Sequence, residues 1–169
     1  DFSKNDKLNN SKDPFSEFFI SNDYEISYNP IWVKNHSNNQ YDFVFQDIEN
    51  TLYYYSNNGE FIRKRELPNQ IIGDIQQIDI YKNGRLQLLF RTIDNLYLLD
   101  RNGNEVDELT FKIESGIINN PVSVFDYEKN RNYRIVLSSD SKIAMFDSRG
   151  KIVTGFKPES INSNIVQSP

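Results

Sequence analysis

The sequence predicts an all-β protein, built as a partial β-propeller of about three four-stranded antiparallel blades. Short apolar runs lead into three glycine-containing turns, and the turn glycines, Gly59, Gly103 and Gly150, lie 44 and 47 residues apart. A repeat of about 40–45 residues that contains strands is typical of propeller blades. Helices are not expected, because no segment keeps the apolar period of an amphipathic helix for three turns.

Each glycine turn is expected to join the third and fourth strands of its repeat. The clearest copy is the stretch 95–106, in which one apolar run precedes Asn102-Gly103 and a second run follows it. Asn-Gly tolerates the positive φ angles of a type I′ turn, so the pattern predicts a tight β-hairpin.

Aligned on these glycines, the repeats contain strands whose character changes with their place in the repeat. The second strands are almost continuously apolar, as expected when both faces of a sheet are covered. The fourth strands are charged, and the cluster Arg63-Lys64-Arg65 is expected to lie on a solvated outer strand. The expected strands are 30–34, 41–45, 52–55, 61–67, 75–79, 86–90, 96–99, 105–111, 121–125, 133–137, 143–146 and 151–156.

Composition divides the remaining chain around these repeats. Residues 1–13 are mostly polar and are expected to form a disordered arm. The aromatic segment 14–29 ends in the alternating residues Tyr24, Ile26 and Tyr28, and is expected to cover an edge or add a strand to the first repeat. The predicted segments are 1–13, 14–29, the repeats 30–70, 71–116 and 117–158 within 30–158, and 159–169 as the lead-in to a further repeat.

Three repeats are too few to close a ring, since propellers typically have about four to eight blades. We therefore expect either further blades beyond Pro169 in a longer protein or a second copy that completes the ring. An open end would leave apolar blade faces exposed, so self-association through those faces is also expected.

The composition excludes several classes of protein. The chain has no cysteine, which excludes disulfides, thiolate nucleophiles and cysteine-based metal sites. Its formal net charge is −5, and one short basic cluster does not make a nucleic-acid surface. No apolar run approaches the ~20 residues of a membrane-spanning helix, so no membrane insertion is expected.

No residue pattern points to catalysis. His36 is the only histidine and stands in an asparagine-rich turn, a poor place to bury a general base. Asp107 and Glu108 are neighbours on an expected edge strand, whereas a glycosidase holds two carboxyl groups across a cleft. The glycines lack the spacing of a phosphate-binding loop. The sequence therefore predicts no enzyme, no catalytic residue and no cofactor-binding residue.

One turn carries the pattern of a possible metal site. Asp126, Glu128, Asn130 and Asn132 bear side-chain oxygens at alternate positions, as a hard cation such as Ca²⁺ requires. The alternative is a polar hairpin turn whose Asp and Asn side chains cap their own backbone. Calcium is thus the one cofactor that the pattern allows.

Aromatic residues of the first repeat form a second candidate site. Trp32, Tyr53 and Tyr55 could form a platform for a carbohydrate or a peptide. Alternation along a strand places Tyr53 and Tyr55 on one face and Tyr54 on the other. Packing between blades is the alternative explanation for all of them.

The stretches 77–90, 95–103 and 124–136 resemble propeller-type repeats of large, uncharacterised envelope proteins of Gram-negative bacteria. Those repeats are similar to quinoprotein-like and integrin-type propeller repeats, and the resemblance covers about residues 30–158. It implies a non-enzymatic propeller segment of a longer protein in the periplasm or at the cell surface. The integrin-type pattern binds calcium through Asp-rich turns, from which this chain departs in two of its three turns.

The function expected from these observations is that of a protein-interaction scaffold in a bacterial envelope protein. Its partner would be another protein or further blades of the same polypeptide. The alternative is a propeller module that binds calcium or a glycan. A third possibility is a fragment of a quinoprotein-like enzyme, although its cofactor would need a pocket built from several blades.

Overall fold

A computed structural model describes residues 24–113, 120–138 and 142–155 of the 169-residue chain. These residues form eleven β-strands and no helix, which confirms the all-β class. None of them belongs to a helix long and apolar enough to cross a membrane. The strands are β1 Ile26–Asn35, β2 Gln40–Asp47, β3 Thr51–Ser56, β4 Phe61–Glu66, β5 Ile72–Ile78, β6 Gln87–Arg91, β7 Asn95–Leu99, β8 Phe111–Lys112, β9 Ser123–Phe125, β10 Arg134–Ser138 and β11 Ile143–Asp147.

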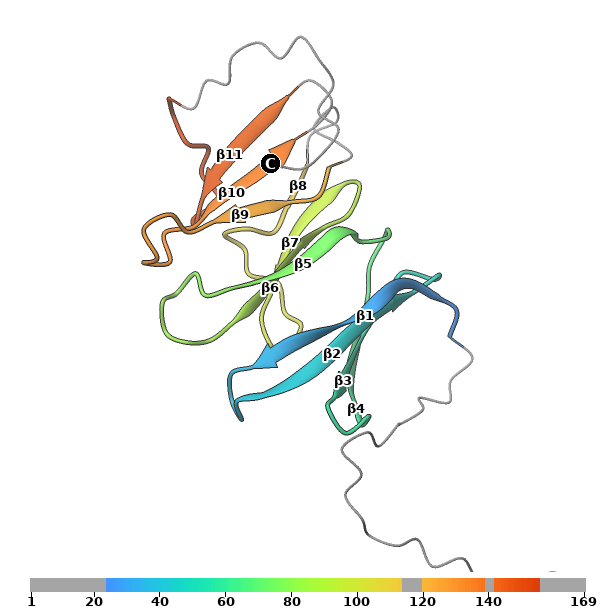
Figure 1. The fold of residues 1–169 in the computed structure, drawn as a ribbon. Coiled ribbons are helices and arrows are strands. Elements are labelled where there is room, and N and C mark those ends of the chain that lie inside the picture. Colours follow the sequence, from blue (N-terminus) through green and yellow to red (C-terminus); the bar gives the residue numbers. More distant parts are fainter. Residues whose placement is uncertain (1–23, 114–119, 139–141, 156–169) are drawn as a thin grey trace, which may run out of the picture.

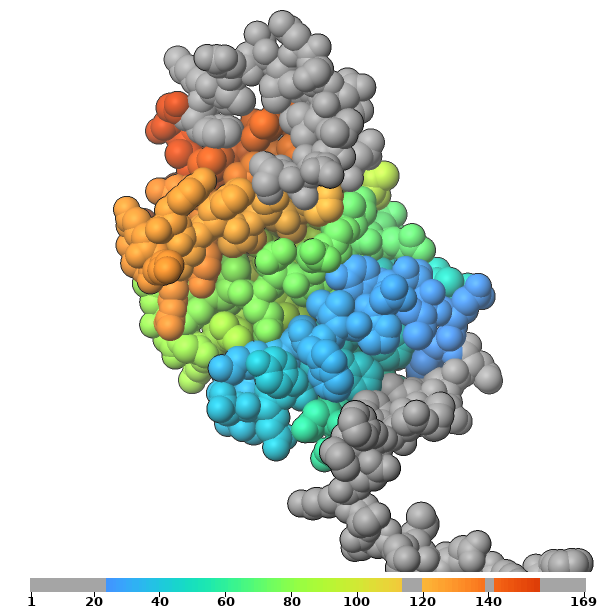
Figure 2. All heavy atoms as spheres, in the orientation of Figure 1, coloured from blue at the N-terminus to red at the C-terminus, as the bar shows by residue number. Residues whose placement is uncertain are grey.

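The strands form three antiparallel sheets, each made of consecutive strands. We call them sheet 1, with the order β1-β2-β3-β4, sheet 2, with the order β5-β6-β7-β8, and sheet 3, with the order β11-β10-β9. The three sheets follow one another along the molecule in chain order (Figure 1). In the space-filling view they form successive bands of one body (Figure 2).

The predicted first, second and third strands of every repeat are confirmed to within a few residues. The first strand of sheet 1 is longer than expected, because β1 begins at Ile26 and pairs with β2 through two register shifts. The segment that was expected to add a strand therefore contributes the beginning of β1 itself. The predicted arm 1–13, most of the segment 14–29 and the lead-in 159–169 lie outside the described residues.

The fourth strand is predicted correctly only in sheet 1. In sheet 2, the stretch expected to form it makes a single β-bridge from Glu105 to Leu99, and the strand β8 starts only at Phe111. The cause is a turn that directs both Val106 and Leu109 into the core. Residues three apart in a straight strand would point to opposite faces.

Sheet 3 likewise departs from the predicted four strands. In the described part of the chain it has three strands, followed by a single bridge between Phe146 and Ile152. The expected strand 151–156 is thus reduced to that bridge in its described part, and residue 156 lies outside the described residues. Among the described residues, sheet 3 thus has three strands and not the predicted four.

The three glycine turns share one hydrogen-bonding pattern, but their predicted turn type is wrong. In the middle copy, the N–H of Gly103 donates to the carbonyl of Asp100 at 3.0 Å, and the N–H of Asp100 donates to Asn104 at 2.8 Å. Only the glycine has a positive φ, +81°, whereas a type I′ turn needs positive φ at both central residues. This geometry is a type I turn followed by a glycine bulge. The same bonds occur around Gly59 and Gly150.

Two apolar clusters fill the spaces between neighbouring sheets. The central strands β2 and β6 are buried along almost their whole length, as predicted for second strands. The cluster between sheets 1 and 2 comprises Val33, Val44, Leu52, Tyr54, Leu67, Ile71, Ile75, Leu88, Phe90, Tyr97 and Leu99. The cluster between sheets 2 and 3 comprises Ile78, Leu89, Leu96, Leu98, Val106, Leu109, Ile113, Val122, Ile135, Leu137 and Phe146.

In sheets 1 and 2, a fully buried polar side chain near the end of the second strand forms hydrogen bonds to the segment that leads into the following sheet. The amide of Gln46 accepts from the N–H of Ile71 at 2.9 Å and donates to the carbonyl of Asn69 at 3.2 Å. Arg91 takes the same position in sheet 2 and donates to the carbonyl of Asn120 at 3.1 Å. Because buried polar groups are costly when unpaired, these bonds hold the crossing segments in place.

Replacing Gln46 with methionine should destabilise the fold while nearly preserving side-chain volume. The change leaves the buried N–H of Ile71 without its acceptor. We expect the free energy of unfolding to fall by about 1–3 kcal/mol in denaturant titrations.

The matched control is Gln40→Met, at the exposed first residue of the same strand. It should change the unfolding free energy by less than about 0.5 kcal/mol. Equal losses for the two variants would contradict the role assigned to Gln46.

Candidate functional site

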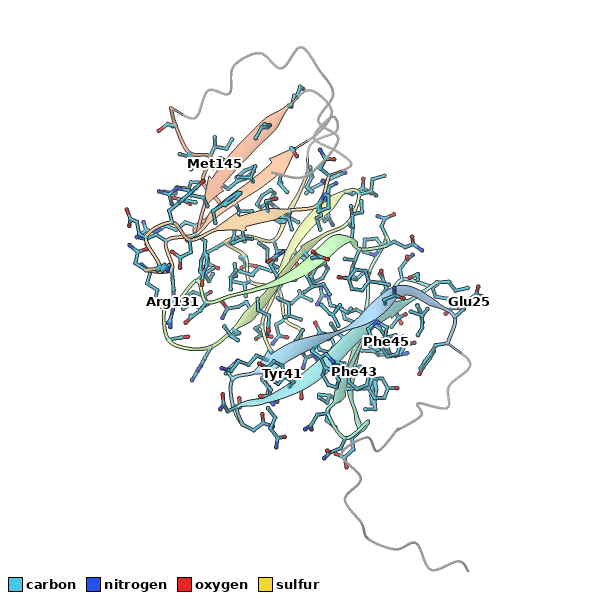
Figure 3. The ribbon with its side chains drawn as sticks, viewed as in Figure 1. Glu25, Tyr41, Phe43, Phe45, Arg131 and Met145 are labelled. Atoms are coloured by element: carbon cyan, nitrogen blue, oxygen red, sulfur yellow. The ribbon has the colours of Figure 1, made fainter. Side chains whose placement is uncertain are left out.

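The face of sheet 1 that points away from sheet 2 is covered with aromatic rings. Strand registers pair Trp32 with Phe43, Phe43 with Tyr55, and Tyr55 with Phe61 across all four strands. Tyr41, Phe43 and Phe45 follow one another along β2 (Figure 3). We call this surface the aromatic face; its residues are Trp32, Tyr41, Phe43, Phe45, Tyr53, Tyr55 and Phe61.

The rings of the aromatic face pack in two arrangements. Neighbouring rings on the central strands stack. The ring centres of Phe43 and Tyr55 are 5.6 Å apart and those of Phe45 and Tyr53 are 5.2 Å apart, and the two ring planes of each pair are inclined by 16°. At the flanks the rings meet edge to face, with Trp32 on Phe43 at 72°. These are favoured geometries for aromatic pairs, so the contacts hold one another in position.

The aromatic face has a buried centre and an exposed rim. Phe43, Phe45, Tyr53 and Tyr55 are all buried. At the rim, Trp32 is 60% exposed, Tyr41 53% and Phe61 55%. Beside the rim lies a hollow of about 580 Å³, lined by Trp32, Gln40, Tyr41 and Asn57. Exposed aromatic rings grouped in this way are typical of contact surfaces.

The structure therefore brings together the three predicted aromatic residues but gives them different surroundings. Trp32 lies at the exposed rim, whereas Tyr53 and Tyr55 are in the buried centre. The Tyr53 hydroxyl donates to the Asp47 carboxylate at 3.0 Å. Burial, together with this bond, raises the pKa of Tyr53 well above its usual value. Tyr54 points to the other face and joins the core between the sheets, as alternation predicts.

The predicted metal-binding residues lie together in the β9–β10 turn. The Asp126 carboxylate accepts the backbone N–H groups of Asn130 and Arg131, at 3.1 Å and 3.0 Å. Asn130 accepts from the N–H of Asn132 at 2.9 Å, and its amide donates to Glu128. These bonds match the capped polar hairpin expected as the alternative. Among the described residues no group of three or more His, Asp or Glu side chains is placed to hold a metal ion, and calcium binding stays a prediction.

The arginines of β4 were expected to lie in solvent, but in the structure they are partly buried. The Arg63 guanidinium lies 3.6 Å from the centre of the Tyr54 ring, a cation–π contact. Arg65 forms an ion pair with Glu105 and donates to the carbonyl of Gly103 at 2.8 Å. Period-two alternation points both arginines toward sheet 2, so that of the three basic residues only Lys64 is exposed. Sequence reasoning missed this, although the spacing of the two arginines carries the signal.

A second connection between sheets was also missed. Arg131, in the β9–β10 turn (Figure 3), forms an ion pair with the buried Asp79 carboxylate at 2.7 Å. Asp79 begins the β5–β6 turn of sheet 2, at the position that Asp126 has in the β9–β10 turn. The two residues are distant in sequence, so no local pattern indicates their contact.

His36 is half-buried rather than freely exposed. Its Nδ1 accepts the backbone N–H of Leu86 at 3.1 Å, and this bond joins the β1–β2 turn of sheet 1 to sheet 2. Burial, and the nearby Arg101 and Arg85 cations, lower the pKa of His36 below its usual value. The neutral imidazole is therefore the form that the fold favours.

The lowered pKa predicts that acid destabilises the fold through His36. The unfolded chain binds a proton near the ordinary pKa of 6.5, whereas the folded chain binds it only at lower pH. The stabilisation is thus present above about pH 6.5 and is lost as the pH falls through the folded pKa. Denaturant titrations from about pH 8 to about pH 5 measure this loss.

The variant His36→Asn isolates this contribution, because its amide oxygen can accept the Leu86 N–H but does not titrate. The variant should lose less stability between those pH values than the parent chain. The same pH dependence in both proteins would show that His36 contributes nothing to it.

No protein-family model matches this chain. No curated protein gives a significant match to it. No solved structure gives a significant match either. The resemblance to envelope-protein repeats accordingly rests on the residues 77–90, 95–103 and 124–136 of this sequence.

Proposed function

We propose that this chain is a propeller-type segment that acts as a non-enzymatic interaction scaffold within a larger bacterial envelope protein. The support for blades is threefold. Each sheet is a meander of consecutive strands, neighbouring sheets pack face to face, and the third strand of each sheet ends in the same glycine turn. Propellers are built from such repeated units. The envelope assignment is supported by the resemblance alone.

The observation that carries the proposal is the aromatic face. Its buried centre comes from β2 and β3, the same strands that supply Val44, Leu52 and Tyr54 to the filled core on the opposite side. A sheet with apolar side chains on both faces is built to be covered on both. The exposed rim residues Trp32, Tyr41 and Phe61 extend this surface to solvent.

The occupant that fits the aromatic face is another β-sheet of the same kind. The two occupied interfaces each contain residues of the central strands of adjacent sheets. The centre of the aromatic face comes from the same strands of sheet 1, and its rim is exposed. In the longer protein that sheet would belong to a further repeat, and for the chain alone it would come from a second copy.

A specific observation favours a second candidate, a glycan. The 580 Å³ hollow combines the exposed rings of Trp32 and Tyr41 with the side-chain amides of Gln40 and Asn57. Rings can cover the apolar face of a sugar while amides bond its hydroxyl groups.

Trp32 is the only tryptophan of the chain, so its fluorescence reports on the aromatic face directly. If a second copy covers this face, raising the protein concentration should shift the emission to shorter wavelength and protect Trp32 from acrylamide. Light scattering should show a larger mass at the same concentrations. A monomeric mass with unchanged emission would contradict a sheet as the occupant.

The double variant Tyr41→Ser/Phe61→Ser keeps the tryptophan reporter but removes two rim rings. It should weaken association by at least about tenfold, as expected for buried aromatic anchors. The control is Tyr127→Ser in the β9–β10 turn, where the ring is 78% exposed, and association should be unchanged. An emission shift with a neutral oligosaccharide at constant mass would instead favour the glycan.

A further inference from the structure

A second hollow lies where three turns of sheets 1 and 2 meet. It has a volume of about 400 Å³ and lies between the β1–β2, β5–β6 and β7–β8 turns. Its lining includes the charged or titratable residues His36, Arg85, Arg101 and Asp100. None of these belongs to the aromatic face, so the hollow is a separate site.

The cations of this hollow have no carboxylate partner in the described part of the chain. The two ion pairs there join Arg65 to Glu105 and Arg131 to Asp79. Arg101 donates to the hydroxyl of Ser37, a neutral group. Both Arg85 and Arg101 lie near enough to His36 to lower the pKa of its imidazole. The guanidinium groups thus converge on one place from two different turns.

Asp100, the carboxylate in the lining, forms no hydrogen bond to Arg85 or Arg101 among the described residues. Both oxygens of Asp100 are used within their own turn, where they accept the backbone N–H of Asn104 at 2.8 Å and its side-chain amide at 3.1 Å. Two like charges that share a partly enclosed space repel each other, and a bound anion would relieve that repulsion. Arginine binds carboxylate and phosphate oxygens particularly well.

The rest of the lining is suited to a neutral, hydroxylated body. Asn83 and Asn102 present side-chain amides, and the Tyr81 ring forms part of the wall. The Tyr81 hydroxyl donates to the Glu108 carboxylate at 3.3 Å, which fixes the ring. The volume exceeds that of an isolated oxyanion and lies within the range of small-molecule pockets.

We propose that this hollow binds a small hydroxylated molecule carrying an oxyanion, such as a sugar phosphate or a sugar acid. Arg85 and Arg101 bind the anionic group, and the amides and the Tyr81 ring contact the sugar. The proposal does not depend on the occupant of the aromatic face, and variants at Tyr41 and Phe61 should leave this binding unchanged.

Isothermal titration of the full chain at constant ionic strength tests the proposal. The probes are glucose 6-phosphate, glucuronate, glucose and inorganic phosphate. We expect one or both charged sugars to bind, and glucose and inorganic phosphate to bind at least about tenfold more weakly. Comparing glucose 6-phosphate with glucuronate shows whether the bound oxyanion is a phosphate or a carboxylate.

Arg85→Ala and Arg101→Ala should each weaken binding of the charged sugar by at least about tenfold, the effect of losing one hydrogen bond to a charged group. Arg85→Lys should retain part of the affinity. The control Arg149→Ala removes an exposed arginine from the equivalent turn of sheet 3 and should not change binding. Thermal melting establishes that each variant is folded.

Three results would overturn the proposal. The first is that no probe gives more heat of binding than chloride does at the same ionic strength. The second is that inorganic phosphate or glucose binds as tightly as the charged sugars. The third is that the folded Arg85 and Arg101 variants bind as tightly as the Arg149 variant.

Discussion

The structure depends on one constraint, that the central strands of its sheets are apolar on both faces. β2, β3, β6 and β7 are buried almost throughout. A sheet with two apolar faces cannot be stable alone in water, because each face gains stability only when another layer removes it from solvent. Sheet 2 meets this requirement with a core cluster on each side. Sheet 1 meets it with a core cluster on one side, and on the other side the centre of the aromatic face is buried while its rim stays exposed.

Apolar packing by itself does not determine how one sheet is placed against the next. In this chain directional polar contacts do so, because each bonds a group of one sheet to a group of its neighbour or of the connecting chain. Gln46 and Arg91 hold the crossing segments, while Arg131 pairs with Asp79 across sheets 2 and 3. Many of these groups are buried, where a misplaced partner would leave a costly unpaired group. The arrangement of the sheets therefore combines non-directional burial with a few specific bonds.

Local patterns predicted the strands well, because strand character depends on neighbouring residues. The apolar runs at 41–45, 86–90 and 133–137 place β2, β6 and β10 correctly. Prediction failed where tertiary packing overrides local preference. Val106 and Leu109 turn into the core and shorten the fourth strand of sheet 2. The predicted turn type was wrong because Asn-Gly permits two hairpin geometries, and of Asn102 and Gly103 only the glycine takes a positive φ.

For the candidate sites, too, local patterns predicted some features and tertiary packing determined the others. Alternation along β3 correctly placed Tyr53 and Tyr55 on one face, but it could not show that both are buried while Trp32 of β1 is exposed. The hollow that contains Arg85 and Arg101 could not be predicted at all. Its cations come from turns of sheet 2, and His36 comes from sheet 1. Only the packing of one sheet on the other brings these side chains together.

The packing of consecutive sheets in chain order is the central claim, and nuclear Overhauser effects test it most directly. The N–H of Ile75 donates to the Tyr28 hydroxyl at 3.2 Å, and the N–H of Asp79 donates to the Tyr133 hydroxyl at 3.1 Å. Each bond joins one sheet to the next. The account predicts cross-peaks between these amide protons and the respective tyrosine rings. Their absence, in spectra that retain the cross-peaks within sheets between Val44 and Tyr54, would contradict it.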